Sequence, residues 1–184
     1  GSRNALNPEA YRQLEAAFRQ AQADPEVRCV LLTGADPSFC SGDDVKEIMA
    51  GPARESTVAQ LRQVRPRPTP AAIAVLECDR PVIAAVNGSA FGFGFEIQGC
   101  CDFSFAGTNA RFALKELNHG ALPAWAVSRG VERYGNSLIS FLALSTMELD
   151  AHEAKRLGIV IDVYEAAELM PKVEEIAARI GKNS

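Results

Sequence analysis

Residues 81–96 read PVIAAVNGSAFGFGFE, and this stretch decides the fold. The run Pro81 to Val86 is apolar and lacks strict alternation, which is typical of a strand buried on both faces of a parallel sheet. Asn87-Gly88 is a turn signal. A Gly-Phe-Gly sequence then leads into Glu96 to Cys100, which is apolar enough to form a buried helix. A buried strand, a turn and a buried helix in succession predict a layered α/β structure.

The alternation of strand and helix continues on both sides of this stretch. Asn7-Pro8 is typical of a helix start, with an N-cap followed by proline at the first helical position, and Asp24-Pro25 ends the helical pattern. Val27 to Thr33 (VRCVLLT) predicts another buried strand. We therefore expect an α/β fold with mostly parallel strands. The remaining patterns predict helices over 45–49, 54–64, 71–76, 124–134, 137–144, 151–157 and 165–180, and strands over 102–106, 110–114 and 159–163.

Length and composition narrow the class of protein. The 184 residues suit a single domain spanning residues 1–184. The apolar fraction of 47% and the charged fraction of 23% exclude disordered and collagen-like chains. The longest apolar runs fall short of the ~18 residues that a membrane helix needs. The chain has 19 basic and 23 acidic residues, so it lacks the excess of basic residues that is typical of a nucleic-acid-binding protein.

The cysteines indicate a reducing compartment. There are five, an odd number, and none forms a CxxC pair. We interpret them as reduced, buried small side chains of a cytoplasmic protein. Only His119 and His152 could join them as ligands, so we expect no metal site.

Two short segments offer backbone N–H groups to a ligand. At the Gly-Phe-Gly helix start, the N–H groups of residues 93–95 lack intrahelical acceptors and attract negative charge. The segment Ser41-Gly42-Asp43-Asp44 also suits a close approach of backbone to ligand. Taken alone, the first fits tight packing and the second an ordinary capped loop. Ser41 is a poor candidate nucleophile, since the GxSxG elbow is absent.

Glu96 and Glu116 form a candidate carboxylate pair. Glu96 lies within the apolar sequence FGFGFEIQGCC, where a glutamate is costly unless it is paired, protonated or functional. Glu116 follows the run RFALK, where a solvated face is the simpler interpretation. Two carboxyl groups that share a site differ in protonation, which provides one acid and one base.

Several motifs, in order, resemble the crotonase (enoyl-CoA hydratase/isomerase) superfamily. They are RNALN at 3–7, FCSGDDVKE at 39–47, PVIAAVNGSAFGFGFE at 81–96, FALKE at 112–116 and AHEAKRLGIV at 151–160. The resemblance implies a spiral of repeated ββα units that assembles as trimers or dimers of trimers and binds acyl-CoA thioesters. It implies no cofactor beyond the coenzyme A of the substrate.

The resemblance also implies roles for individual residues. The backbone N–H groups of Ser41 and Phe93 would form an oxyanion hole for the thioester carbonyl. Glu96 would deprotonate the water that attacks C3, and Glu116 would protonate C2. The expected reaction is reversible hydration of a 2-enoyl-CoA. The residues expected beside the CoA portion are Arg3, Ala5, Leu6, Gly42, Asp43, Asp44 and Gly92.

Some features depart from the family pattern and keep alternatives open. Phe93 stands where a glycine is usual, Lys115 stands where proline is common, and PAWA at 123–126 replaces a glycine-rich turn. Compared with the family, the sequence begins after the first strands and ends before the C-terminal helices that build the trimer. We therefore expect an uncovered apolar surface. The alternatives are an isomerase, decarboxylase, dehydratase or thioester hydrolase, and a non-catalytic CoA-binding scaffold.

Overall fold

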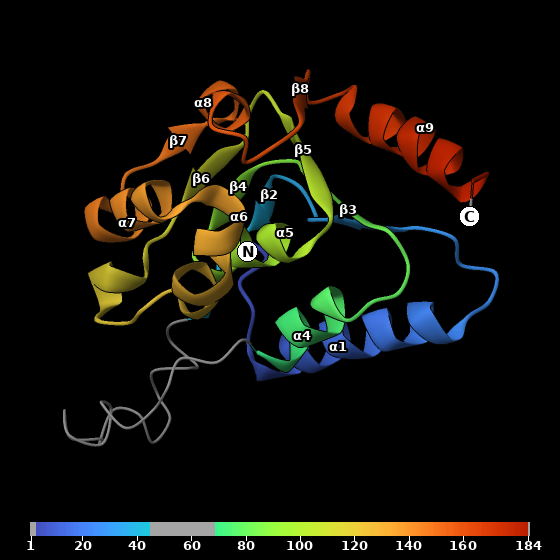
Figure 1. Cartoon of the computed structure of the whole chain (residues 1–184), viewed down its shortest axis with the longest axis horizontal. Coiled ribbons are helices and arrows are strands. Elements are labelled where there is room, and N and C mark those ends of the chain that lie inside the picture. The colour runs from blue at the N-terminus through green and yellow to red at the C-terminus, as the bar shows by residue number, and fades with distance from the viewer. Residues whose placement is uncertain (1–2, 45–68, 184) are drawn as a thin grey trace.

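The computed structural model describes residues 3–44 and 69–183, so the helices predicted over 45–49 and 54–64 lie outside the described residues. Strands and helices alternate as expected (Figure 1). The α-helices are α1 (Pro8–Ala23), α4 (Pro70–Leu76), α5 (Phe93–Cys100), α6 (Val131–Tyr134), α7 (Asn136–Ser145), α8 (Ala151–Arg156) and α9 (Leu169–Gly181). Glu116–His119 (η2) forms a 3₁₀-helix and Ala126–Gly130 (η3) a π-helix.

The strands form two sheets of four. The first sheet is parallel, in the order β1 (Val30–Thr33), β3 (Val82–Val86), β5 (Phe103–Gly107) and β8 (Asp162–Tyr164). The second has the order β2 (Ser38–Cys40), β4 (Ser89–Phe91), β6 (Arg111–Ala113) and β7 (Leu149–Asp150), and only its β6–β7 pair is antiparallel. Each of the first three pairs of consecutive strands therefore adds one strand to each sheet, as a spiral of ββα units requires.

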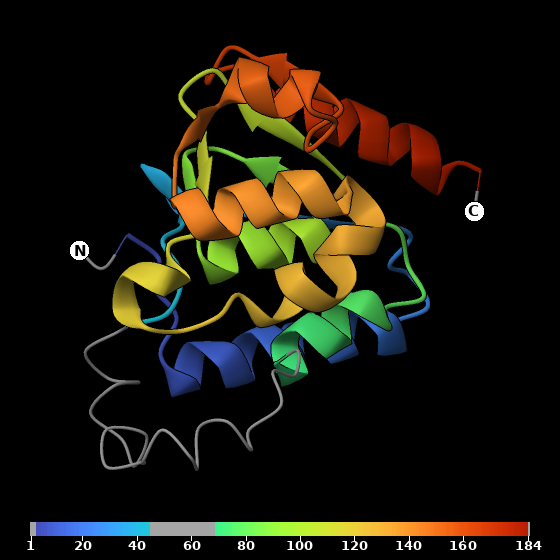
Figure 2. The ribbon, with the colours of Figure 1, turned by 60° about the vertical axis from the view of Figure 1, so that its left-hand side comes forward.

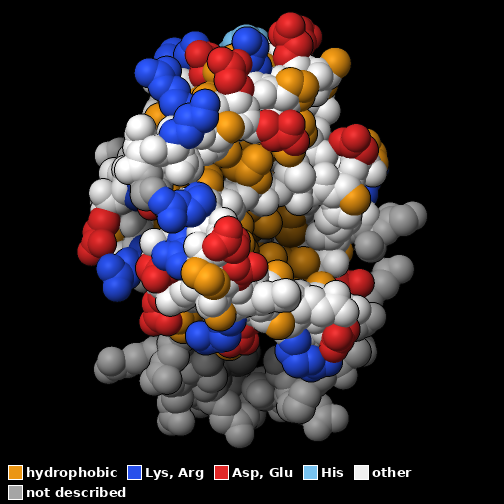
Figure 3. All heavy atoms as spheres, turned by 90° about the vertical axis from the view of Figure 1, so that its right-hand side faces the viewer, with side chains coloured by type: hydrophobic (Ala, Val, Ile, Leu, Met, Phe, Trp, Pro, Cys, Tyr) orange, Lys and Arg blue, Asp and Glu red, His pale blue; other side chains and the backbone are white. Residues whose placement is uncertain are grey.

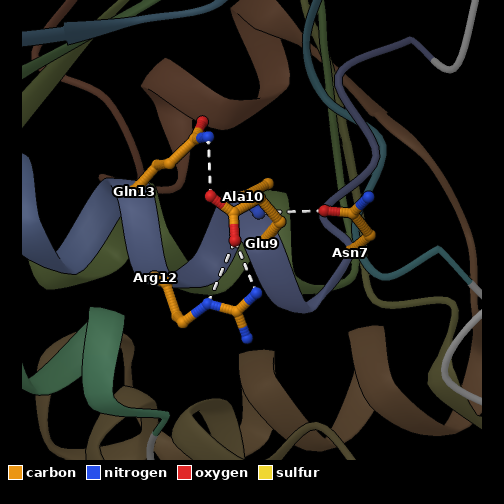
Figure 4. A network of polar contacts seen from close by, with 5 residues as sticks. All are labelled: Asn7, Glu9, Ala10, Arg12 and Gln13. Atoms are coloured by element: carbon orange, nitrogen blue, oxygen red, sulfur yellow. Dashed lines mark hydrogen bonds and ion pairs between the residues drawn. The ribbon is translucent and has the colours of Figure 1, made fainter.

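Helix α1 begins where the sequence predicts. The side chain of Asn7 accepts a hydrogen bond of 2.9 Å from the N–H of Ala10, and Pro8 occupies the first helical position. Glu9 accepts hydrogen bonds from Arg12 and Gln13 along the exposed face (Figure 4). These contacts fix the first turn of α1, which lies beside α4 (Figures 1 and 2).

Helix α5 is the buried centre of the molecule. All eight of its residues are buried, and two of its glycines permit close packing. A Cβ on Gly94 would lie 2.1 Å from the carbonyl oxygen of Cys40 in β2. A Cβ on Gly99 would lie 2.4 Å from the ring of Trp125, which is only 2% exposed. The prediction of a buried helix after the Gly-Phe-Gly sequence is confirmed.

Two predicted elements are misplaced. The strand predicted over 159–163 is wrong, because β8 begins at Asp162, opposite Phe105. The apolar residues Ile159 and Val160 are buried in the turn after α8, where both of their N–H groups donate to Ala154. The final helix begins at Leu169 rather than 165, because residues 166–168 form a turn.

The cysteines are all free. Cys40, Cys100 and Cys101 are buried, as predicted, whereas Cys29 and Cys78 are half-buried. Within residues 3–44 and 69–183, the structure contains no helix long and apolar enough to cross a membrane.

Candidate active site

The two segments predicted to border the CoA portion lie side by side. Leu6 pairs with Asp43 in a parallel bridge, and its N–H donates to the carbonyl of Gly42 over 2.8 Å. The N–H of Asp44 donates back to the carbonyl of Leu6 over 2.9 Å. Residues far apart in the sequence, among them Leu6 and Gly42, thus form one continuous backbone surface.

Asn4 anchors the first of these segments and was not predicted. Its side-chain amide donates to the carbonyl oxygens of Ala35 and Ser38, each over 2.7 Å. Arg3 and Asn4 both have positive φ, which turns the backbone toward this contact. The sequence shows only an asparagine before a helix cap, and nothing in that pattern indicates a partner more than 30 residues away.

Gly42 allows the segment that contains Ser41 to lie close to the start of α5, where Phe93 provides the other predicted oxyanion-hole N–H. Gly42 has a φ of 92°, and a Cβ there would lie 2.8 Å from the carbonyl oxygen of Phe91 and 3.4 Å from the amide nitrogen of Phe93. Phe93 is the first residue of α5, so its N–H has no intrahelical acceptor. The N–H of Ser41 differs, because it donates to the carbonyl of Arg3 over 3.2 Å.

Glu96 is buried beside the start of the next helical segment. Glu96 is only 5% exposed. Its Oε1 accepts a hydrogen bond of 3.0 Å from the N–H of Ala126. Burial raises the pKa of Glu96 to about 8, against the opposing effect of the Ala126 N–H. The charge of Glu116 raises this pKa further, so the two carboxyl groups interact.

Glu116 lies at the first position of η2 and is half-buried, so the simpler interpretation of a fully solvated face is wrong. A Cβ on Gly92 would lie 3.3 Å from its Oε1. Its Oε2 is buried and accepts no hydrogen bond from the described residues. Burial raises the pKa of Glu116 to about 7. Lys115 points elsewhere, because its ammonium pairs with Glu148 over 2.9 Å.

The pKa values of both glutamates are therefore raised toward the neutral range, where a carboxyl group can act as acid or as base. Burial is the largest cause of the rise for both carboxyl groups. Transfer of a proton from one of these glutamates to the other leaves their combined charge unchanged.

A cavity formed by described residues lies elsewhere. It has a volume of 220 Å³ and is lined by Pro25, Val27, Arg28, Asp79, Arg80 and Pro81. These residues precede β1 and β3 in the chain, whereas Glu96 lies in α5 and Glu116 in η2. The cavity includes none of the predicted site residues.

Comparison with known proteins identifies the family. The family described as enoyl-CoA hydratase/isomerase matches residues 2–184. Crotonyl-CoA hydratase of Syntrophomonas wolfei is 34% identical over 182 residues, covering 96% of this chain and 67% of the relative. Short-chain-enoyl-CoA hydratase of Clostridium acetobutylicum is 33% identical over 183 residues, covering 98% of this chain and 68% of the relative.

Solved structures give the same result. The crystal structure of enoyl-CoA hydratase from Mycobacterium tuberculosis is similar with a TM-score of 0.83 and 36% identity, covering 100% of this chain and 75% of that one. The chain belongs to the enoyl-CoA hydratase/isomerase family, and its fold is that of the crotonase superfamily. It is an enzyme of the hydratase-like class of lyases.

The burial of Glu96 leads us to predict that its contribution to folding stability depends on pH. A carboxyl group whose pKa rises on folding stabilises the protein below its unfolded pKa, near 4.5, and this contribution is lost as pH rises through about 8. Glu96→Gln does not titrate and retains an acceptor for the Ala126 N–H. We expect the variant to melt at the wild-type temperature near pH 5 and to be more stable at pH 9, by a few kcal/mol at ~1.4 kcal/mol per pKa unit.

Thermal melting across this pH range checks the prediction. Glu132→Gln is the matched control, because the Glu132 side chain is 73% exposed and pairs only loosely with Arg129, at 3.8 Å. The control should follow the wild type at every pH. Equal melting temperatures for Glu96→Gln and wild type at pH 9 would contradict the burial argument.

Proposed function

We propose that this enzyme catalyses the reversible hydration of a 2-enoyl-CoA to a 3-hydroxyacyl-CoA. The observation that supports it most is the pair of interacting carboxyl groups beside the glycine-lined start of α5, both with raised pKa values. Hydration requires one group that accepts a proton from water and another that donates one to carbon. Two carboxyl groups with pKa values raised toward neutral pH meet that requirement when one is protonated and the other ionised.

In the proposed reaction, the thioester carbonyl oxygen accepts hydrogen bonds from the N–H groups of Phe93 and Ser41. Water gives a proton to Glu96 as its oxygen attacks C3, and the electron pair of the double bond moves onto the thioester as an enolate. The two N–H groups stabilise this charge, typically by ~3–4 kcal/mol for each donor. Glu116 then donates its proton to C2. The proton gained by Glu96 restores one proton to the pair.

The two backbone segments with Leu6 and Asp43 are proposed to hold the CoA portion. Arg3, Ala5 and Leu6 would border it on one side, and Gly42, Asp43 and Asp44 on the other. Gly92 would leave room for the thioester beside Glu116, since a Cβ at that position would approach Oε1 to 3.3 Å. Arg3 and Lys46 are the basic side chains proposed to lie near the phosphates, and Lys46 lies outside the described residues.

One contact favours a second candidate function. Because the Ser41 N–H donates to Arg3, the second oxyanion donor is available only after that bond is broken. A protein that keeps the bond would bind CoA esters without turning them over, as a scaffold does. The length of 3.2 Å makes this one of the longer backbone hydrogen bonds, and we therefore favour exchange of the Arg3 carbonyl for the thioester.

Turnover distinguishes the two functions. The purified chain is incubated with enoyl-, hydroxyacyl- and malonyl-type CoA esters, and the products are identified by mass. Gain of one water by crotonyl-CoA supports the hydratase. Saturable binding of the ester with no change in mass supports the scaffold. Loss of carbon dioxide, migration of the double bond or release of free CoA would instead identify one of the other crotonase-type reactions.

Assembly as a homotrimer or a dimer of trimers is part of the proposal. Phe141 and Leu144 of α7 are 46% and 75% exposed, and Met147 just beyond is 55% exposed. Hydrophobic side chains also gather in a hollow on the face shown in Figure 3. Exposed apolar surface of this kind favours association. We expect light scattering to detect trimers or hexamers, and a monodisperse monomer at high concentration would contradict this prediction.

A further inference from the structure

Tyr11 lies next to the candidate active site and belongs to none of the motifs that predicted it. Its hydroxyl, on the first turns of α1, donates a hydrogen bond to Oδ1 of Asp43. Its ring meets the ring of Phe93 edge to face, with centroids 4.9 Å apart. One side chain therefore contacts both backbone segments that carry the proposed oxyanion donors.

The Tyr11 contact also explains where the unusual Phe93 side chain lies. Phe93 is 5% exposed, so its ring is packed within the protein against Tyr11. The ring contact ties the first residue of α5 to α1. The hydroxyl contact ties α1 to the segment that contains Gly42. Gly42 in turn lies close to the Phe93 amide, so these contacts connect α1, the Gly42 segment and the start of α5.

Asp43 adds a third acidic group to the surroundings of the glutamates. Its charge raises the pKa of both Glu96 and Glu116, and the Tyr11 hydroxyl opposes the rise that partial burial gives to the pKa of Asp43 itself. The other groups that act on the glutamates are the backbone N–H groups at Ala126, Trp125, Lys115 and Glu116.

We propose that Tyr11 and Asp43 form a positioning pair that holds the Ser41–Asp43 segment against the start of α5. The proposal rests on the proposed hydratase function. The hydrogen bond fixes the geometry of the donors, and the charge of Asp43 adds to the rise that burial gives to the pKa of both glutamates. The two effects belong to different atoms, so separate variants distinguish them.

Tyr11→Phe removes the hydroxyl and keeps the ring on Phe93. If the hydrogen bond positions the Ser41–Asp43 segment, kcat should fall on the order of 10- to 100-fold, because a misplaced catalytic group slows the reaction. KM should rise by a smaller factor. The matched control is Tyr164→Phe, which changes a tyrosine of β8 whose ring lies 5.8 Å from that of Phe105, away from the site. The control should leave kcat and KM unchanged.

Asp43→Asn removes the charge and keeps an oxygen that accepts from Tyr11. Loss of a nearby negative charge lowers the pKa of both glutamates. Both limbs of the pH–rate profile should therefore move to lower pH. An unshifted profile overturns the charge role.

A ¹³C NMR titration of the glutamate carboxyl groups, in wild type and Asp43→Asn, gives the same information without turnover. If wild type converts none of the CoA esters, the proposed function fails, and the titration still decides the electrostatic role of Asp43. If Tyr11→Phe and Asp43→Asn change only the melting temperature, with kcat, KM and both titrations unchanged, the pair is merely structural and the proposal is wrong.

Discussion

Glu96→Gln and Glu116→Gln should each lower the rate of crotonyl-CoA hydration by about 100- to 10,000-fold, the usual effect of losing a positioned acid or base. Both amides are isosteric with the carboxyl groups they replace. Binding of the CoA ester should remain, because the proposed oxyanion donors are backbone N–H groups. Steady-state rates and direct binding of the ester to each variant measure the two effects separately.

The double variant tests whether the glutamates act on one water. Residues that act as a unit are not additive, so the double variant should be little slower than the poorer single variant. Glu132→Gln, on the exposed face of α6, should retain full activity. Full activity of Glu116→Gln would leave one catalytic carboxyl and favour an isomerase-like reaction. Full activity of both single variants would exclude the carboxylate mechanism.

Gly94→Ala should strongly lower the stability of the fold, although it adds only one methyl group. Its Cβ would lie 2.1 Å from the carbonyl oxygen of Cys40, so α5 would have to move away from β2. Overpacking in a core costs roughly 1–3 kcal/mol, and a clash with backbone belongs at or beyond the upper end. At ~2–4 °C for each kcal/mol, we expect the melting temperature to fall on the order of 10 °C.

Gly181→Ala provides the comparison, because it adds the same methyl group at the end of α9. Its Cβ would meet the Cβ of Arg28 at 3.4 Å, an ordinary contact. Alanine is the better helix former by about 1 kcal/mol, so this variant should melt at or slightly above the wild-type temperature. If Gly94→Ala is as stable as Gly181→Ala, the close packing of α5 on β2 is not essential.

Long elements with strong signals could be predicted from the sequence. The Asn7-Pro8 cap located α1, and the unbroken apolar run at 82–86 located β3. The second sheet was largely missed. Its strands β2, β4 and β7 have two or three residues each, too few for any periodicity to appear. They exist because neighbouring strands supply hydrogen bonds, which a local pattern does not reveal.

The candidate site, too, could be predicted only in part from the sequence. Glu96 stood out because a glutamate within an apolar helix demands an explanation. Glu116 did not, since its burial depends on Gly92 and on the chain around η2. The Tyr11–Asp43 hydrogen bond joins residues 32 apart in sequence, and neither residue carries a local signal for it. The raised pKa values of the glutamates likewise depend on burial that only the folded chain defines.

The strand order β1-β3-β5-β8 follows the order of the chain. As the polypeptide leaves the ribosome, each new strand of this sheet therefore finds its partner already synthesised, and no strand has to be inserted between two earlier ones. Assembly can proceed by addition at one growing edge. A lesion in β8 should then spare the earlier strands, whereas a lesion in β3, which joins β1 to β5, should stop assembly near its beginning.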